Sequence, residues 1–166
     1  MDIRYLKQLM IKPIIFNDCT FYITEVHYNI NAPHWVSEPH KHPWYEYTYI
    51  TSGAASTFMC NCEYITSAGN ASLIPPGIIH SNFGGNDTAL SIRFYIEKNS
   101  NSEGSSCFNN LSSTLMQPYP HPICTDISSL FKAKSLFAVQ ASFINFILEL
   151  HERFTPMTNI KSSTPY

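Results

Sequence analysis

Three histidines and one glutamate in two short segments have side chains suited to binding a divalent transition metal. His40, His42 and Glu46 lie in the first segment, and His80 follows a Pro-Pro-Gly turn in the second. Imidazole nitrogens and carboxylate oxygens are common ligands of such metals. Alternate side chains of a strand share one face, so the three even-numbered residues would point the same way in an extended segment. We therefore expect one metal site, with His80 supplied by a neighbouring strand.

The same alternation predicts which residues line a ligand pocket beside that site. Trp44, Thr48 and Ile50 have the same parity as the expected metal ligands, and Asn82 follows His80 by two positions. We expect the first three to line the barrel interior, Asn82 to lie near its mouth, and all four to contact a bound small molecule. Three tyrosines have the opposite parity, and we expect helices to cover them from outside: Tyr45, Tyr47 and Tyr49.

Two sequence patterns resemble the paired motifs of the cupin family. The pattern His-x-His-x3-Glu-x6-Gly begins at His40, and Gly-x5-Pro-x-Gly-x2-His ends at His80. His34 stands where the family usually opens its first motif with glycine, and Gly84 stands where asparagine usually closes the second. Neither departure removes a ligand. The stretches HKHPWYEYTYITSG and SLIPPGIIHS are further similar to the N-terminal sensing domain of arabinose-regulator (AraC) type transcription factors.

The resemblance implies a mainly β protein, a cupin-like double-stranded β-helix (jelly-roll) barrel with C-terminal α-helices. It implies a sensor that binds a small effector, sugar-like or of another class, and forms a homodimer in the cytoplasm. DNA would be contacted only through a helix-turn-helix domain outside this chain. The four-ligand set implies Zn, Mn, Fe or Ni as a divalent cofactor, and the alternative to a sensor is a metal-dependent cupin enzyme of the dioxygenase, isomerase or decarboxylase type. No catalytic residue is assigned.

Hydrophobic periodicity predicts many short strands followed by helices. Several short β-favouring runs separated by turn signals are typical of a sandwich or barrel. Two breaks are expected, at Ser52-Gly53 and in a Gly/Asn-rich turn over 83–87. The expected units are a barrel at 1–98, a loop and irregular or edge strand packed on it at 99–125, dimerising helices at 126–154, and a linker toward the absent DNA-binding domain at 155–166.

The expected C-terminal helices are apolar over an unusually wide arc. One row at helical spacing comprises Leu136, Val139, Phe143, Ile147, Leu150 and Phe154. A second row lies beside it, and its members Phe137, Ile144 and Leu148 are the expected dimer contacts. One packing face needs only one such row, so the second predicts a partner subunit.

Composition limits the remaining classes of function. The 166 residues suffice for one domain, 44% of them are hydrophobic, and the formal net charge is −2. Only 10 residues are Lys or Arg, without a basic run, so this chain has no electrostatic footprint for nucleic acid. The five cysteines are odd in number and suggest no disulfide framework. There is no signal-peptide pattern, no apolar run of about 20 residues for a membrane span, and no nucleophile elbow or phosphate loop.

Overall fold

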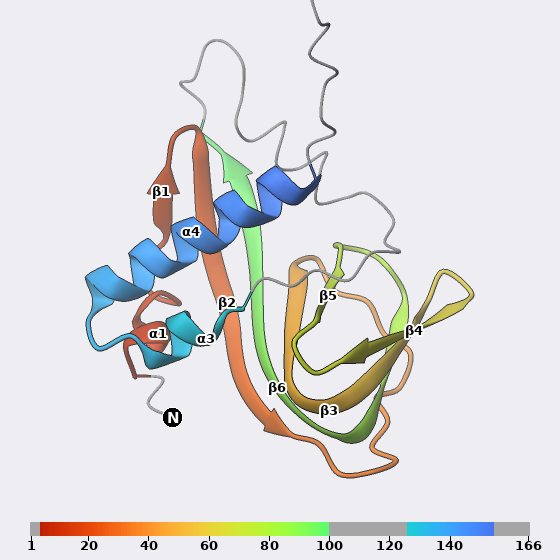
Figure 1. Ribbon diagram of the computed structural model, residues 1–166. Coiled ribbons are helices and arrows are strands. Elements are labelled where there is room, and N and C mark those ends of the chain that lie inside the picture. Colours follow the sequence, from red (N-terminus) through yellow and green to blue (C-terminus); the bar gives the residue numbers. More distant parts are fainter. Residues whose placement is uncertain (1–3, 100–125, 155–166) are drawn as a thin grey trace, which may run out of the picture.

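The computed structural model describes residues 4–99 and 126–154 (Figure 1). The loop or edge strand expected at 99–125 and the linker expected at 155–166 therefore fall outside the described residues, apart from Asn99. The elements follow in the order α1 (Arg4–Gln8), β1 (Ile14–Phe16), β2 (Cys19–Ile30), β3 (Tyr45–Met59), β4 (Cys62–Ser67), β5 (Ala71–Ile74), β6 (His80–Lys98), α3 (Ser128–Lys132) and α4 (Leu136–Phe154).

The strands form one antiparallel sheet that curls on itself. Its order is β1-β2-β6-β3-β4, and β5 pairs with the first half of β3. The long strands β3 and β6 bend together along their shared ladder, so their far halves wrap toward β4 and β5 (Figure 1). This curled sheet followed by helices confirms the mainly β, cupin-like barrel with C-terminal helices.

Two expected strand breaks are wrong, because the chain passes through both positions without leaving the sheet. Ser52-Gly53 lies inside β3, and 83–87 lies inside β6. The ladder between the two strands shifts register around Ser52, which marks a β-bulge. Gly53 has a φ of 72° and Asn86 a φ of 62°, so both adopt left-handed conformations that suit these residue types. The turn-forming residues therefore bend two continuous strands rather than ending them.

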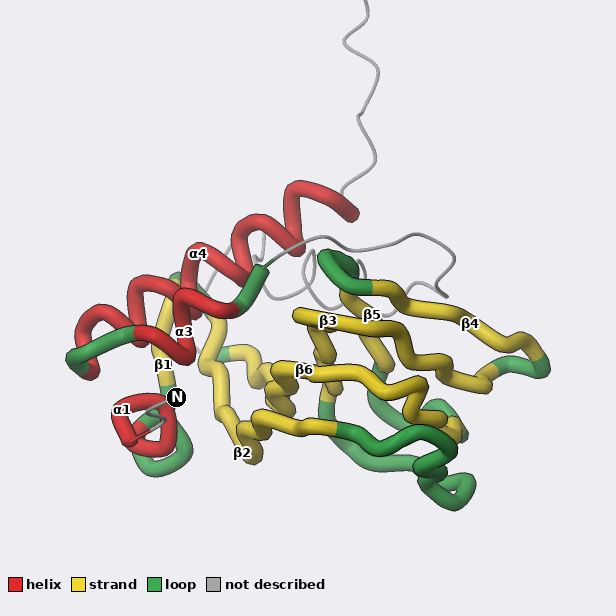
Figure 2. Tube along the Cα trace, turned by 60° about the horizontal axis from the view of Figure 1, so that its bottom comes forward, coloured by secondary structure: helices red, strands yellow, loops and turns green. Residues whose placement is uncertain are grey.

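The hydrophobic core lies between the sheet and the helices, outside the barrel. The three described helices gather on one side of the sheet, and α4 runs across β1, β2 and β6 (Figures 1 and 2). Phe143 of α4 packs against Phe21 and Phe94, with ring centroids 5.7 Å away in each case. The three odd-numbered tyrosines of β3 pack in or against this core, which confirms the expected covering by helices: Tyr45, Tyr47 and Tyr49.

The two apolar rows of α4 have different surroundings. Val139, Phe143, Ile147 and Leu150 of the first row are buried against the sheet. In the second row Phe137 is 79% exposed and Leu148 is 38% exposed, whereas Ile144 is half-buried against the core. Phe146, which belongs to neither row, is also buried. One apolar row therefore packs within the chain, and most of the other faces outward.

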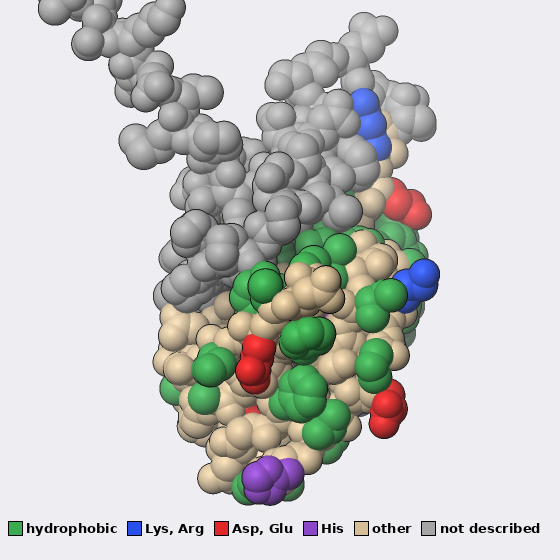
Figure 3. Space-filling view, turned by 90° about the vertical axis from the view of Figure 1, so that its right-hand side faces the viewer, with side chains coloured by type: hydrophobic (Ala, Val, Ile, Leu, Met, Phe, Trp, Pro, Cys, Tyr) green, Lys and Arg blue, Asp and Glu red, His purple; other side chains and the backbone are tan. Residues whose placement is uncertain are grey.

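The described surface outside the helices has no large apolar area on the side shown in Figure 3. Hydrophobic side chains lie there singly or in small groups among polar atoms, and charged side chains are few. None of the described helices is both long enough and apolar enough to cross a lipid bilayer.

Candidate functional site

Three of the four expected metal ligands come together at the open end of the barrel. We call His40, His42 and His80 the histidine cluster; one candidate ligand atom from each lies within 4.8 Å of the others. His40 and His80 exchange both backbone hydrogen bonds, with N–O distances of 3.0 and 2.9 Å, in an isolated bridge. This bridge fastens the segment before β3 to the first residue of β6. Backbone pairing therefore places the two rings side by side, with centroids 4.3 Å apart.

Backbone carbonyls fix the tautomer of each ring in the histidine cluster. The Nδ1 atoms of His40, His42 and His80 lie 2.8, 2.8 and 3.0 Å from the carbonyl oxygens of Glu38, Trp44 and Ile78. A carbonyl oxygen only accepts, so each Nδ1 donates and each neutral ring keeps the lone pair on Nε2.

The Nε2 atoms of His42 and His80 are buried and lack a hydrogen-bond partner among the described residues. Burial lowers the pKa of His80, which favours the neutral ring that a metal requires. Buried polar atoms are rarely left unpaired, so these two nitrogens need a ligand such as a metal ion. The residues present therefore fit a divalent metal.

Glu46, the fourth expected ligand, lies beside the histidine cluster and belongs to an ion-pair network. Its Oε2 lies 3.3 Å from Nε2 of His42, outside hydrogen-bonding geometry, and accepts a 2.7 Å hydrogen bond from Nε of Arg93. Arg93 also donates through Nη1 to Glu25. Burial opposes ionisation of Glu46, but the adjacent His42 ring and the Arg93 charge outweigh it and lower the pKa of Glu46 to about 2. The structure thus places an ionised carboxylate beside the cluster.

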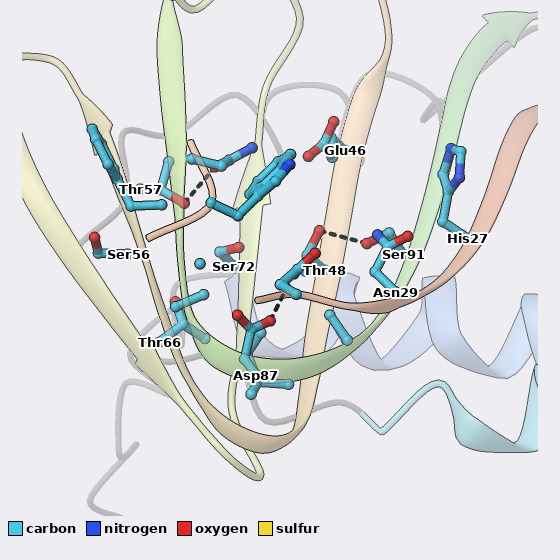
Figure 4. Close-up of a pocket in the computed structure, with 18 of the residues that line it drawn as sticks. His27, Asn29, Glu46, Thr48, Ser56, Thr57, Thr66, Ser72, Asp87 and Ser91 are labelled. Carbon is cyan, nitrogen blue, oxygen red and sulfur yellow. Dashed lines mark hydrogen bonds between the residues drawn. The ribbon is translucent and has the colours of Figure 1, made fainter. Parts of the chain in front are cut away.

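A polar cavity of about 250 Å³ fills the barrel interior (Figure 4). Thr48, Ile50 and Asn82 line it, as their parity indicated, and Glu46 lies at its edge. Several polar side chains are paired within the wall, such as Thr48 with Ser91 at 3.0 Å. The other described lining residues are His27, Asn29, Asn31, Trp35, Ala55, Ser56, Thr57, Thr66, Ser72, Phe83, Gly84, Asp87, Ala89, Ser91 and Arg93.

The expectation that Trp44 faces this cavity is wrong. β3 begins at Tyr45, so Trp44 lies in a bend to which strand alternation does not apply. Its ring instead stacks on His42, with centroids 5.2 Å apart and planes at 11°. Trp35, in the loop after β2, supplies the aromatic wall that was expected from Trp44.

Sequence reasoning also missed the cavity face of β6. From Asp87 to Arg93 every odd-numbered residue lines the cavity, whereas Leu90 and Ile92 are buried in the core. The alternation of polar and apolar residues over 87–94 carries this signal. The turn expected over 83–87 hides this signal, because it excludes Asp87 from the strand.

Comparison with known proteins agrees with this geometry. Residues 23–86, which include the histidine cluster and most of the cavity wall, match the family model described as the AraC-like ligand binding domain. This stretch is similar to AraC-like ligand-binding domains, and the described helices lie outside the matched residues. No curated protein sequence matches the chain.

Several solved structures are distantly similar to this chain. KdgF from a Halomonas species is 17% identical with a TM-score of 0.37, over 46% of this chain and 77% of that chain. An RmlC-like cupin from Shewanella frigidimarina is 15% identical with a TM-score of 0.36, over 48% and 78%. Oxalate decarboxylase from Bacillus subtilis is 17% identical with a TM-score of 0.36, over 55% and 28%.

Proposed function

We propose that this chain is the effector-sensing and dimerising part of an AraC-type transcriptional regulator. A small molecule binds in the barrel cavity, and the occupied cavity favours one arrangement of the helices. The observation that carries the proposal is that β3 and β6 each present one face to the polar cavity and the other to the core beneath α4. DNA is contacted through a helix-turn-helix domain outside this chain.

The cavity supports a small, hydroxylated effector such as a sugar. Its volume of about 250 Å³ lies just below the usual range of ligand pockets, about 300 to 1,000 Å³. Hydroxyl and amide groups dominate its wall, and they match the hydroxyl groups of a polyol. Trp35 adds a flat apolar surface on which the carbon face of a sugar ring can lie.

Ligand binding in the cavity can be coupled to the helices, because the same strands contact both. A ligand shifts a conformational equilibrium only if it interacts differently with the two states. Thr48 faces the cavity, and Tyr47, the residue before it, packs on Phe146 of α4 with ring centroids 4.7 Å apart. A ligand that repositions this part of β3 therefore acts directly on the contact with α4.

The outward row of α4 is the proposed contact with a second copy of this chain. Phe137 and Leu148 are exposed, and Ile15 of β1, 70% exposed, lines a shallow groove together with Phe137. One apolar row on a helix is self-complementary, because a two-fold axis brings the same residues of both copies together. We propose a homodimer built on Phe137, Ile144 and Leu148.

A divalent ion of Zn, Mn, Fe or Ni is the proposed occupant of the histidine cluster. The three Nε2 lone pairs would hold it, and Glu46 would neutralise part of its charge from beside His42. Such an ion polarises a bound ligand oxygen or water. In a sensor its role is to fix the His40–His80 bridge and to orient the effector.

A metal-dependent cupin enzyme is the second candidate. The histidine cluster favours it, because three imidazole ligands leave coordination positions for a substrate or water. Turnover of a small molecule by the metal-loaded protein, lost on metal removal, would decide for this alternative. Binding without turnover would decide for the sensor.

The two tryptophans of the chain allow a direct test of the cavity. Trp35 lines it and Trp44 does not, so Trp44→Phe and Trp35→Phe each leave one reporter. A library of sugars, polyols, amino acids and aromatic metabolites is screened by fluorescence. We expect the effector to change emission in Trp44→Phe and to leave Trp35→Phe nearly unchanged. A library in which no compound affects Trp35, or a hit that reports only through Trp44, would contradict effector binding in the barrel.

A further inference from the structure

Charged side chains occupy two places in the wall of the barrel cavity. Glu46 and Arg93 form the first, where the guanidinium is bound by two carboxylates, those of Glu46 and Glu25. Asp87 of β6 forms the second, on another part of the wall (Figure 4). The positive charge of Arg93 is therefore already matched within the protein, and little of it remains to attract an anionic ligand.

Asp87 is a buried carboxylate with neutral partners. It is 1% exposed and accepts hydrogen bonds from Nδ2 of Asn31 at 2.9 Å and from the backbone N–H of Gly85 at 3.2 Å. No lysine, arginine or histidine among residues 4–99 and 126–150 forms an ion pair with it. A buried charge without an opposite charge is unfavourable, so a cation placed beside Asp87 would stabilise it.

The remaining groups in the described wall do not compensate the negative charge of Asp87. They are hydroxyls, amides and apolar groups, apart from His27, whose Nε2 is 2.9 Å from Glu25. Apart from this histidine, the charged groups in the described part of the wall are two carboxylates, those of Glu46 and Asp87, and one guanidinium, that of Arg93. An anionic ligand would meet this excess negative charge inside a confined, poorly solvated space, where electrostatic interactions are stronger than in water.

We infer that the cavity selects hydroxylated ligands by their charge and that Asp87 sets the order of their affinities. An amino sugar or amino polyol binds more tightly than its neutral analogue, and the corresponding sugar acid is rejected. A protonated amine donates charge-assisted hydrogen bonds to Asp87, whereas a ligand carboxylate repels it. The inference rests on the proposed effector-binding function and adds to it the chemical class of the effector.

Matched ligand triplets test the order by isothermal titration calorimetry. Glucose, glucosamine and glucuronate form one triplet, and galactose, galactosamine and galacturonate form another. We expect the amine to bind about tenfold more tightly than the neutral sugar, and the acid at least about tenfold more weakly, because hydrogen bonds to charged groups exceed neutral ones by about that factor. In Asp87→Asn the three affinities should converge to within about threefold.

Glu63→Gln is the matched control, because Glu63 is exposed on β4 and does not line the cavity. It removes the same charge from the protein and should leave the order unchanged. An acid that binds as tightly as the amine, or a neutral sugar that binds more tightly than the amine, overturns the inference. This comparison needs only the wild-type protein, so it decides even if Asp87→Asn does not fold. If no triplet binds, the hydroxylated class is wrong, while the wider fluorescence screen still tests effector binding itself.

Discussion

Glu46 and Tyr47 are consecutive residues of β3 whose side chains face opposite sides of the sheet. Glu46 lies at the edge of the barrel cavity beside His42, and Tyr47 is fully buried against Phe146 of α4. A single layer of backbone therefore separates the candidate metal and ligand sites from the helix layer.

The aromatic contact beneath α4 should be a large contributor to stability. Phe146→Ala should lower the free energy of unfolding by about 3 to 5 kcal/mol. Truncating a buried phenylalanine removes apolar surface from the core and leaves a cavity in its place. A double-mutant cycle with Tyr47→Ala in urea should give a coupling of about 0.5 to 1.5 kcal/mol. Strictly additive effects would mean that the two rings do not interact.

The histidine cluster should bind one divalent metal per chain. His42→Ala and His80→Ala should each weaken binding by more than about 100-fold, since loss of a partner outside the ligand set already costs about 10- to 100-fold. Metal content after dialysis against Zn, Mn, Fe or Ni measures this by mass spectrometry. His27→Ala is the control, because His27 bonds Glu25 outside the cluster. Equal metal content in all variants would contradict the site.

Gly53 should be far less tolerant of a side chain than Gly69, although both have positive φ. A Cβ at Gly69 would meet nothing within 4 Å, so Gly69→Ala should cost about 1 to 2 kcal/mol from backbone conformation alone. A Cβ at Gly53 would clash with the carbonyl oxygen of Asn86, and Gly53→Ala should cost about 1 to 3 kcal/mol more. Equal urea midpoints for the two variants would show that β3 and β6 are not in close contact there.

The outward row of α4 should hold the dimer together. Phe137→Glu combined with Leu148→Glu should give a folded monomer, because both residues are exposed in one chain and carboxylates at an interface are costly. Size-exclusion chromatography with light scattering measures the mass, and Glu149→Ala on the same helix is the control. A wild-type monomer at high concentration would refute the dimer, and an unfolded double variant would assign this row to the core.

Acid should weaken the ion pair between Glu25 and Arg93. The hydrogen bond with His27 and, against the effect of burial, the charge of Arg93 lower the pKa of Glu25 below its ordinary value of 4.5. The folded protein therefore favours the ionised form, so this stabilisation is present above pH 4.5 and is lost as the pH falls through the folded pKa. Glu25→Gln should reduce the slope of unfolding free energy against pH between about pH 5 and 3. An unchanged slope would exclude this contribution.

Side-chain alternation predicted those parts of the fold where the strands are regular. It placed Thr48 and Ile50 toward the interior and the tyrosines toward the helices, because a regular strand carries its two faces in strict order. The histidine spacing predicted that His40, His42 and His80 would meet. Helical periodicity likewise separated the buried row of α4 from the outward one.

Irregular backbone limited what the sequence could predict about the remaining parts of the fold and the site. The bend before Tyr45 took Trp44 out of the alternation, and the bulge near Gly53 and Asn86 had the composition of a chain turn. Glycine and asparagine favour positive φ in both settings, so local sequence does not distinguish a bent strand from its end. Asp87 was missed for this reason, whereas Trp35 lies in the loop after β2, where side-chain alternation makes no prediction. The ion pair of Glu46 with Arg93 could not be predicted, because nothing in the segment of Glu46 indicates Arg93, which lies 47 residues away.

The two-faced β3 also has a consequence for how such a protein can diversify. Between Tyr45 and Ile50, even-numbered positions contact the cavity and the odd-numbered tyrosines pack in or against the core. Substitutions at Thr48 or Ile50 can change the shape of the cavity without altering the aromatic packing beneath α4. Random libraries limited to such positions, together with Ser91 on β6, are therefore a compact starting point for biosensors that respond to new compounds.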